Sequence, residues 1–354
     1  MSLSNKTTIQ CLMVIVAGAI IPFAFAPYHL YLLAFLSLTV LFYQWSRVES
    51  PGRAFLSGYL FGFAMFGVGV NWLYISINLL GGVNFIGALF FTFLLVAFLA
   101  LYPAICGYMT VRFFRQHRLY AMPPLWLLTE WGRGWLLTGF PWLNIGTSQT
   151  DSPLAAYMPL IGDYGVTFLV CVITASILLI INGSRKQRLI VATCLLLLIS
   201  ISVLLSGKNW TTEKEQQLSV ALIQGAVPQA IKWNPEQRQP TYELYSNLSQ
   251  DYWSSDLVIW PETAIPSLYH RAGDFLTGIR AQQENNPALF MSGIAYLDRT
   301  SNAYYNSVLL LDDKPDFYHK HHLVPFGEYL PLKPLLGEIL QFLKIPMSDF
   351  SAGD

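Results

Sequence analysis

Long apolar runs constrain the fold of this chain more than any other feature of its sequence. The hydrocarbon core of a bilayer is about 30 Å thick, and about 20 consecutive apolar residues in a helix cross it. Runs of this kind fall within the first 206 residues, at about 8–26, 28–45, 54–79, 85–111, 121–140, 159–182 and 188–206. The sequence therefore predicts a multi-pass α-helical membrane domain of about seven helices.

The charged residues mark the end of that domain. They make up 12% of the 354 residues, about half the share of roughly 25% in soluble domains. Residues 1–207 hold 14 charged side chains and residues 208–354 hold 28. We therefore expect a transmembrane domain at 1–207 and a water-soluble domain at 208–354. The net charge is zero, so no general attraction to nucleic acid follows, and no nucleic-acid partner is predicted.

The loops between the apolar runs predict an orientation. Basic residues gather after the second, fourth and sixth runs, at Arg47, Arg53, Arg112, Arg115, Arg118, Arg185, Lys186 and Arg188. Such loops stay in the cytoplasm. Seven spans then place the residues after Gly207 on the outer side, which in a bacterium is the periplasmic side of the inner membrane.

One stretch of the membrane part, "TEWGRGWLLTGFPWLNIGTSQTD", is too polar for a simple anchor. Glu130 and Arg133 stand three residues apart, on one face of a helix. Ionisable groups at membrane depth are costly and usually paired. Two interpretations stay open: a structural ion pair beside interfacial tryptophans, or a site that faces lipid or substrate at the outer leaflet.

The second part of the chain alternates between strand-like and helix-like patterns. Strands are predicted at Leu218–Gln224, Asp256–Trp260, Ala288–Leu297 and Tyr305–Asp312, and helices at about 236–253 and 270–285. This alternation is typical of an α/β layered domain.

Two polar residues stand where functional groups collect in such sheets, just beyond strand ends. Glu262 follows a predicted strand between Pro261 and Pro266, and Lys320 follows a strand-like run, with Glu328 eight residues later. A carboxylate can take a proton from a nucleophile, and an ammonium can hold an oxyanion or activate a thiol. The plainer alternative is a solvated loop charge and a basic surface patch.

Neither the histidines nor the cysteines predict a metal site. His319, His321 and His322 lack a carboxylate or cysteine at a recognisable ligand spacing. The four cysteines lie in apolar runs, where we expect small buried hydrophobes: Cys11, Cys106, Cys171 and Cys194.

Several segments resemble the apolipoprotein N-acyltransferases, membrane-bound members of the nitrilase superfamily. They are "VIWPETAIP", "HKHHLVPFGEYLPL", "GVNWLYISI", "LTGFPWLNIG" and "IQGAVPQAIKW". The resemblance implies an αββα sandwich of the nitrilase (CN hydrolase) type with a Glu–Lys–Cys triad and no cofactor. Glu262 matches the general base, Lys320 the lysine that stabilises the intermediate, and Glu328 a supporting glutamate. Trp233 matches a tryptophan of a loop that engages substrate.

The same resemblance implies an acyl transfer between membrane lipids and a lipoprotein. A phospholipid donates a fatty acyl chain to the cysteine thiol, and the thioester passes it to the N-terminal amine of a diacylglyceryl-cysteine apolipoprotein. The family's cysteine lies some tens of residues beyond the lysine, and the sequence reaches only Asp354. We therefore expect 208–354 to be the N-terminal part of an incomplete nitrilase-like domain. Without the nucleophile, residues 1–354 alone should be inactive.

Two other functions are weighed against this one. The first is a nitrilase-like amidase or acyltransferase with a different acceptor. The second is a membrane transporter or receptor with an outer binding domain. The predicted spans show neither a relay of Asp, Glu and His nor repeat symmetry, which disfavours the transporter.

Overall fold

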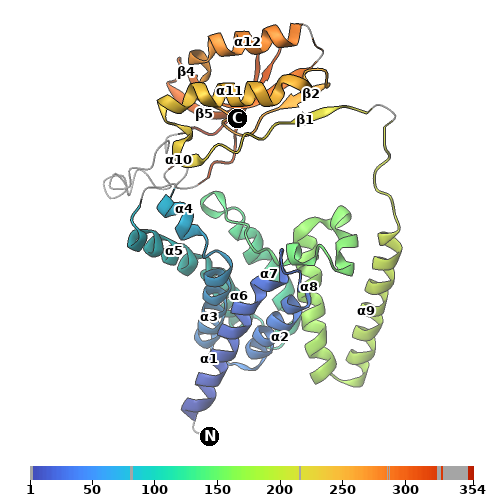
Figure 1. The fold of residues 1–354 in the computed structure, drawn as a ribbon. Helices are drawn as coiled ribbons and strands as arrows, with labels where there is room; N and C mark the ends of the chain where they lie inside the picture. Colours follow the sequence, from blue (N-terminus) through green and yellow to red (C-terminus); the bar gives the residue numbers. More distant parts are fainter. Residues whose placement is uncertain are drawn as a thin grey trace. The chain divides into compact units, whose positions relative to one another are not determined.

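The computed structural model describes residues 3–79, 83–214, 217–284, 286, 288–324, 328–329 and 350–354. The chain divides into two compact units, one of Met1–Ile75 with Asn84–Thr212 and one of Ser76–Val83 with Glu213–Asp354. The first unit is helical and the second carries a β-sheet (Figure 1). This order, a helical part with apolar spans and then an α/β part, confirms the predicted fold class.

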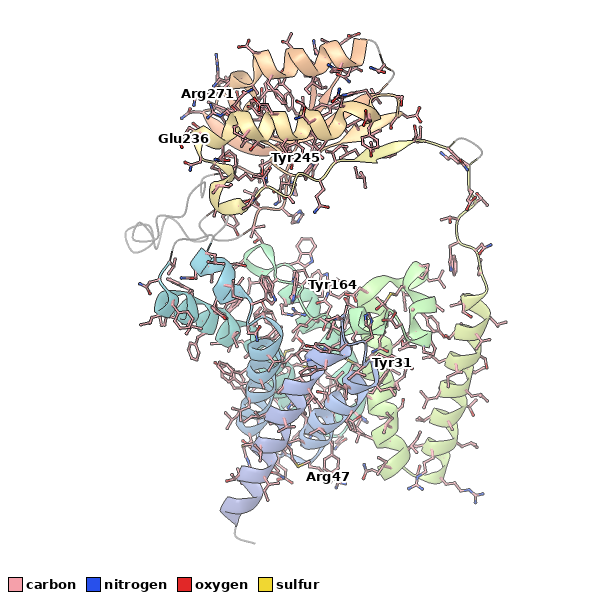
Figure 2. The ribbon with its side chains drawn as sticks, in the orientation of Figure 1. Tyr31, Arg47, Tyr164, Glu236, Tyr245 and Arg271 are labelled. Atoms are coloured by element: carbon pink, nitrogen blue, oxygen red, sulfur yellow. The ribbon has the colours of Figure 1, made fainter. Side chains whose placement is uncertain are left out.

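The first unit is built from helices, and its longest connection, residues 134–157, contains three 3₁₀ helices. In the described residues the α-helices are α1 (Leu3–Ile20), α2 (Leu32–Arg47), α3 (Pro51–Gly69), α4 (Leu73–Leu79), α5 (Phe85–Leu99), α6 (Leu101–Phe113), α7 (Arg118–Arg133), α8 (Met158–Asn182) and α9 (Arg185–Ser206). The part of α4 from Ser76 onward belongs to the second unit. Tyr31 and Arg47 mark the two ends of α2 (Figure 2).

Not every predicted span is matched by a helix of full membrane length. In the described part of the chain, four helical stretches are long and apolar enough to cross a bilayer: Thr7–Ala24, Phe85–Phe113, Pro153–Asn182 and Arg185–Ser206. A fifth forms if α3 and α4, bent by 54°, count as one broken span. Helices α2 and α7 have 16 residues each, about 24 Å of rise. The predicted number of seven spans stays a prediction.

Small residues allow the helices of the first unit to approach closely. A β-carbon on Gly58 of α3 would stand 2.4 Å from the carbonyl oxygen of Pro103 in α6. This close approach fits the role of small residues in membrane helix packing. The buried core of the unit includes Phe42, Trp45, Phe61 and Trp126.

The second unit contains one mixed sheet. Its strands are β1 (Val220–Leu222), β2 (Leu257–Ile259), β3 (Ile265–Leu268), β4 (Leu289–Asp298), β5 (Ala303–Leu311) and β6 (Asp316–His319). The order is β1-β2-β4-β5-β6, with β3 also paired to β4. Strands β1, β2 and β3 run parallel to their neighbours, and β5 is antiparallel to both β4 and β6. The four predicted strands are present, with β1 shorter than predicted.

Helices α11 (Arg238–Ser249) and α12 (Gly273–Glu284) cover one face of this sheet. The indole of Trp260 is central to the core, packed edge-on against Phe290 at 4.8 Å between ring centroids. Its Nε1 donates to Ser249 Oγ at 2.8 Å, so the buried polar atom is satisfied. The two helices match those predicted at about 236–253 and 270–285.

The opposite face of the sheet carries exposed apolar side chains. Val220 of β1 is in register with Leu257 of β2, which is in register with Leu289 of β4. Val220 and Leu289 are both exposed, and Leu222 is 75% exposed. Tyr318 of β6 is exposed on the same face. The described residues of this unit thus form one sheet and one covering layer of helices.

Candidate active site

Glu262 lies in an interruption between two strands that pair with the same neighbour. Strand β2 pairs with the beginning of β4, and β3 pairs with its later part at Ile294 and Ala295. Between them the chain turns at Pro261, whose carbonyl accepts from the Gly293 amide at 3.2 Å. The backbone of Glu262 comes so near that a β-carbon on Gly293 would stand 2.6 Å from the Glu262 Cα. Only glycine on β4 accommodates this turn.

Lys320 is placed by the antiparallel pair β5–β6. Strand β6 ends at His319, and the next amide, that of Lys320, donates to the Asn306 carbonyl at 2.8 Å. Residues opposite each other on antiparallel strands present their side chains on one face. The side chains of Lys320 and Asn306 therefore lie next to each other on the same face of the sheet.

The structure brings the two predicted glutamates and the lysine together. Lys320 Nζ lies 3.0 Å from Glu328 Oε1 and 3.9 Å from Glu262 Oε1. The Asn306 amide joins the two carboxylates, since its Nδ2 donates to Glu262 Oε1 at 2.6 Å and to Glu328 Oε1 at 2.7 Å. An amide NH₂ has two hydrogens, so both bonds form at once.

The two carboxylates differ in their access to solvent. The side chain of Glu262 is 67% exposed, whereas that of Glu328 is 11% exposed. Glu328 Oε2 also accepts from the Val324 amide at 2.7 Å. Among the described residues no donor reaches Glu262 Oε2, so this oxygen is open to an incoming group. The arrangement can accept a proton at Glu262 while Lys320 supplies positive charge beside it.

Trp233 lies one residue from a contact with this cluster. It follows the short helix α10 (Gln229–Lys232) and is half-buried. Its neighbour Lys232 donates from Nζ to the main-chain oxygen of Glu262 at 2.9 Å. Burial lowers the pKa of Lys232 below its ordinary value, and the nearby Glu262 carboxylate opposes that shift.

Asn306 and Lys232 also contact Glu262, and neither of them was selected from the sequence. Asn306 is buried in β5, and its sequence signal is an amide within the apolar run "YYNSVLLL". A buried polar side chain on a strand needs partners, but nothing in the run says which ones. Lys232 carries no local signal, because its partner lies thirty residues away in the chain.

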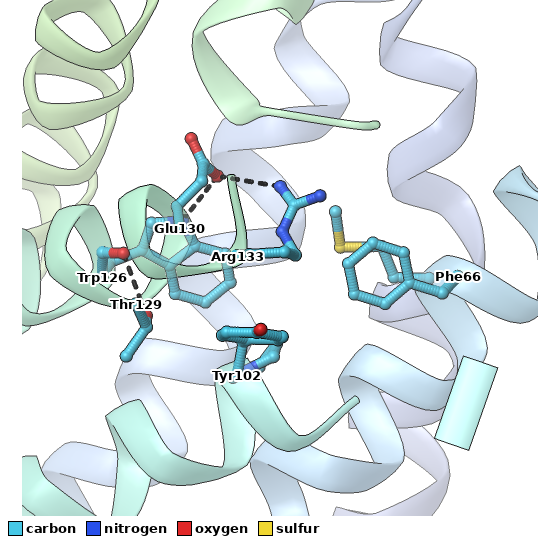
Figure 3. Close-up of a pocket in the computed structure, with 8 residues that line it drawn as sticks. Phe66, Tyr102, Trp126, Thr129, Glu130 and Arg133 are labelled. Atoms are coloured by element: carbon cyan, nitrogen blue, oxygen red, sulfur yellow. Dashed lines mark hydrogen bonds and ion pairs between the residues drawn. The ribbon is translucent and has the colours of Figure 1, made fainter. Parts of the chain in front are cut away.

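A second polar cluster lies inside the first unit. Glu130 and Arg133 of α7 are both buried, and their Oε2 and Nη2 atoms lie 3.9 Å apart. They line a small pocket with Phe66, Tyr102, Trp126 and Thr129 (Figure 3). The guanidinium of Arg133 also lies 5.2 Å from the Phe66 ring centroid.

Both oxygens of the buried Glu130 carboxylate accept hydrogen bonds from groups of this unit. Glu130 Oε1 accepts from Thr167 Oγ1 at 2.6 Å, and Oε2 accepts from Trp126 Nε1 and the Ile145 amide, each at 3.2 Å. Arg133 donates to the carbonyls of Phe140 and Trp142 and to Asn144 Oδ1. These contacts favour the structural interpretation of the pair, which clamps the 140–147 loop to α7.

The four cysteines differ in their burial. Cys106 and Cys171 are buried as expected, whereas Cys11 is half-buried and Cys194 is exposed on α9. Helix α9 buries only 6% of its apolar window inside the protein, which explains the exposed thiol. Within the described residues, no group of three or more His, Cys, Asp or Glu side chains could hold a metal ion.

Two family models match this chain, one over each of its parts. Residues 219–353 match the family model described as carbon-nitrogen hydrolase, and residues 17–176 match that of the apolipoprotein N-acyltransferase N-terminal domain. The fold is thus a carbon-nitrogen hydrolase domain carried by a membrane domain.

Individual relatives extend along nearly the whole chain. The apolipoprotein N-acyltransferase of Methylococcus capsulatus is 40% identical over 347 residues, which cover 97% of this chain and 69% of that protein. That of Vibrio cholerae is 39% identical over 353 residues, covering 95% and 68%, and that of Photobacterium profundum is 37% identical over 360 residues, covering 98% and 68%. The chain belongs to the apolipoprotein N-acyltransferase family, a family of bacterial membrane acyltransferases.

Proposed function

We propose that this protein N-acylates lipoproteins: it moves a fatty acyl chain from a phospholipid to the N-terminal amine of a diacylglyceryl-cysteine apolipoprotein. The names of the relatives support the reaction class. The observation that carries the proposal is the cluster at the strand ends, where the exposed Glu262 carboxylate lies 3.9 Å from Lys320 Nζ.

Each residue of the cluster has a role in the proposed chemistry. Glu262 takes the proton of a cysteine thiol through its open oxygen, and the thiolate attacks the ester carbonyl of the phospholipid. Lys320 stabilises the oxyanion, and Glu328 holds Lys320 in place. The lysophospholipid leaves with a proton, and a thioester remains. Trp233 engages the lipid substrate beside Glu262.

The second half of the reaction uses the same groups in reverse. The free α-amine of the lipoprotein attacks the thioester carbonyl and passes its proton to the glutamate. The amide forms, and the thiolate leaves and recovers a proton. One cavity that serves both substrates in turn gives ping-pong kinetics.

The thiol is not among residues 208–354, which contain no cysteine. The four cysteines of the sequence lie in α1, α6, α8 and α9 of the first unit. Residues 1–354 on their own are therefore expected to form no thioester.

We place the protein in the bacterial inner membrane with the cluster on the periplasmic side, where both lipid substrates reside. The distribution of basic loops supports this orientation.

The test is an in vitro transfer assay with the protein expressed from its whole reading frame. Purified protein is incubated with phosphatidylethanolamine and a synthetic diacylated lipopeptide, and the N-acylated product is detected by mass spectrometry. Glu262→Gln and Lys320→Met should lower the rate at least about 100-fold. The matched surface variants Glu236→Gln and Lys314→Met should act like wild type. Acylation of another amine but not of the lipopeptide would contradict the proposed acceptor.

A further inference from the structure

The peptide unit that follows Glu262 adopts an uncommon conformation. Thr263 has φ +47°, in the left-handed region that β-branched residues rarely occupy. The orientation of this peptide sets the direction in which the Glu262 side chain leaves the turn. A conformation of this kind persists only where surrounding contacts hold it.

Two contacts from different elements hold that turn. Gly293 of β4 packs against it, because a β-carbon there would stand 2.3 Å from the Thr263 amide nitrogen. On another element, Lys232 at the end of α10 donates from Nζ to the Glu262 main-chain oxygen at 2.9 Å. This oxygen belongs to the same peptide unit as the Thr263 amide.

The charges around Glu262 show why a lysine suits this position. Lys320 lies 3.9 Å from the Glu262 carboxylate, Glu328 shares the Asn306 amide with it, and Lys232 approaches from α10. Lys232 is half-buried, so its ammonium loses part of its hydration. The contact with the carbonyl and the nearby carboxylate offset that loss.

We infer that Lys232 is a positioning residue: its ammonium fixes the Glu262–Thr263 peptide and thereby aims the Glu262 carboxylate. The inference rests on the proposed function for its effect on the rate. Its effect on the turn stands on the contact alone.

The kinetic test compares Lys232→Met, Lys232→Arg and the surface control Lys314→Met in the transfer assay. Lys232→Met should lower kcat about tenfold with KM for both lipids nearly unchanged, since small misplacements of a catalytic group cost rate. Lys232→Arg should retain most of the rate. A rise in the phospholipid KM with unchanged kcat would show instead that Lys232 binds substrate.

A second substitution separates positioning from binding. Asn adopts the left-handed region more readily than Thr, so Thr263→Asn should restore several-fold of the rate lost in Lys232→Met. A lysine that only contacts substrate would show no such rescue. Equal loss in the single and double variants would overturn the inference.

A third measurement does not depend on activity. The lysines are reductively methylated with ¹³C-formaldehyde, and the Lys232 signal is assigned from its disappearance in Lys232→Arg and titrated by NMR. Glu262→Gln should lower the pKa of Lys232 further, since it removes the carboxylate that opposes the effect of burial. Glu236→Gln should leave it unchanged. An unchanged pKa of Lys232 in Glu262→Gln would refute the inference even if the transfer assay succeeds. Absence of product with the wild-type protein would count only against the proposed function.

Discussion

Gly293 and Glu262 are packed backbone against backbone, with room for no side chain at residue 293: a β-carbon there would stand 2.6 Å from the Glu262 Cα. The close approach lets the turn between β2 and β3 lie against β4 without breaking the sheet. The direction of the Glu262 side chain therefore depends on a residue thirty-one positions later in the chain.

Gly293→Ala is expected to displace this turn. The clash involves main-chain atoms, which cannot rotate away, so we expect a loss of about 1–3 kcal/mol in the free energy of unfolding and a large loss of transfer activity. Thermal unfolding in detergent and the lipopeptide assay measure both. Gly278→Ala in α12 is the matched control, since nothing lies within 4 Å of its β-carbon, and it should be neutral or slightly stabilising. Wild-type activity in Gly293→Ala would contradict the prediction.

Asn306→Leu should uncouple the two glutamates. The variant keeps the approximate volume but removes the NH₂ group that both carboxylates share. Glu328, which is nearly buried, loses a donor, at a cost of about 1–3 kcal/mol. We expect reduced stability together with a fall in kcat, measured against Asn247→Leu on the exposed surface of α11. Unchanged kinetics in Asn306→Leu would show that the bridge is unnecessary.

Glu130→Gln tests the buried pair of the first unit. Removing one charge leaves Arg133 without its partner inside the protein, a change that costs about 3–5 kcal/mol at buried sites. The variant should unfold at a lower temperature in detergent than wild type, whereas Glu49→Gln, at an exposed position, should not. If the variant is as stable as wild type but inactive, the pair serves a functional site and not the 140–147 loop.

The second unit should become less stable in mild acid, because His319 is more readily protonated in the unfolded chain than in the folded one. Burial lowers the pKa of His319 below its ordinary value, so the unfolded chain takes up a proton at a higher pH than the folded one. Neutral His319 therefore contributes its full stabilisation above the ordinary histidine pKa of about 6.5. This contribution is lost as the pH falls below that value. His319→Phe keeps the stacking with Tyr305, whose ring centroid lies 4.4 Å away.

Unfolding temperatures at pH 7.5 and 5.5 measure this effect. Wild type should lose more stability between the two values than His319→Phe does. Some loss should remain in the variant, since desolvation and the nearby Arg299 and Arg271 also lower the pKa of His270. An identical loss in both proteins would assign the acid sensitivity to other groups.

Local patterns in the sequence were enough to predict most of the fold. Strands β2, β4 and β5 follow from apolar and β-branched runs, and α11 and α12 from their helical periodicity. Strand β3 was not predicted, because it is four residues long and contains Pro266, which usually excludes a strand. It forms because β4 is long enough to pair with β2 and β3 in succession.

The residues of the candidate site could be selected from the sequence only where they follow the ends of strands. Glu262 and Lys320 could be chosen from their positions, and the resemblance supplied Glu328 and Trp233. Asn306 and Lys232 act through partners far along the chain, and no local pattern reports such distances. In the same way, the spacing of Glu130 and Arg133 predicted a pair, but their bonds to Thr167 and Asn144 depend on how the helices pack.

The sheet face that bears Val220, Leu222, Leu289 and Tyr318 limits how this protein can be prepared. An excised fragment of residues 213–354 would expose this apolar face to water, and copies of the fragment would associate through it. Size-exclusion chromatography should then show aggregates of the fragment unless detergent covers the apolar face. Leu222→Lys should make the fragment more soluble.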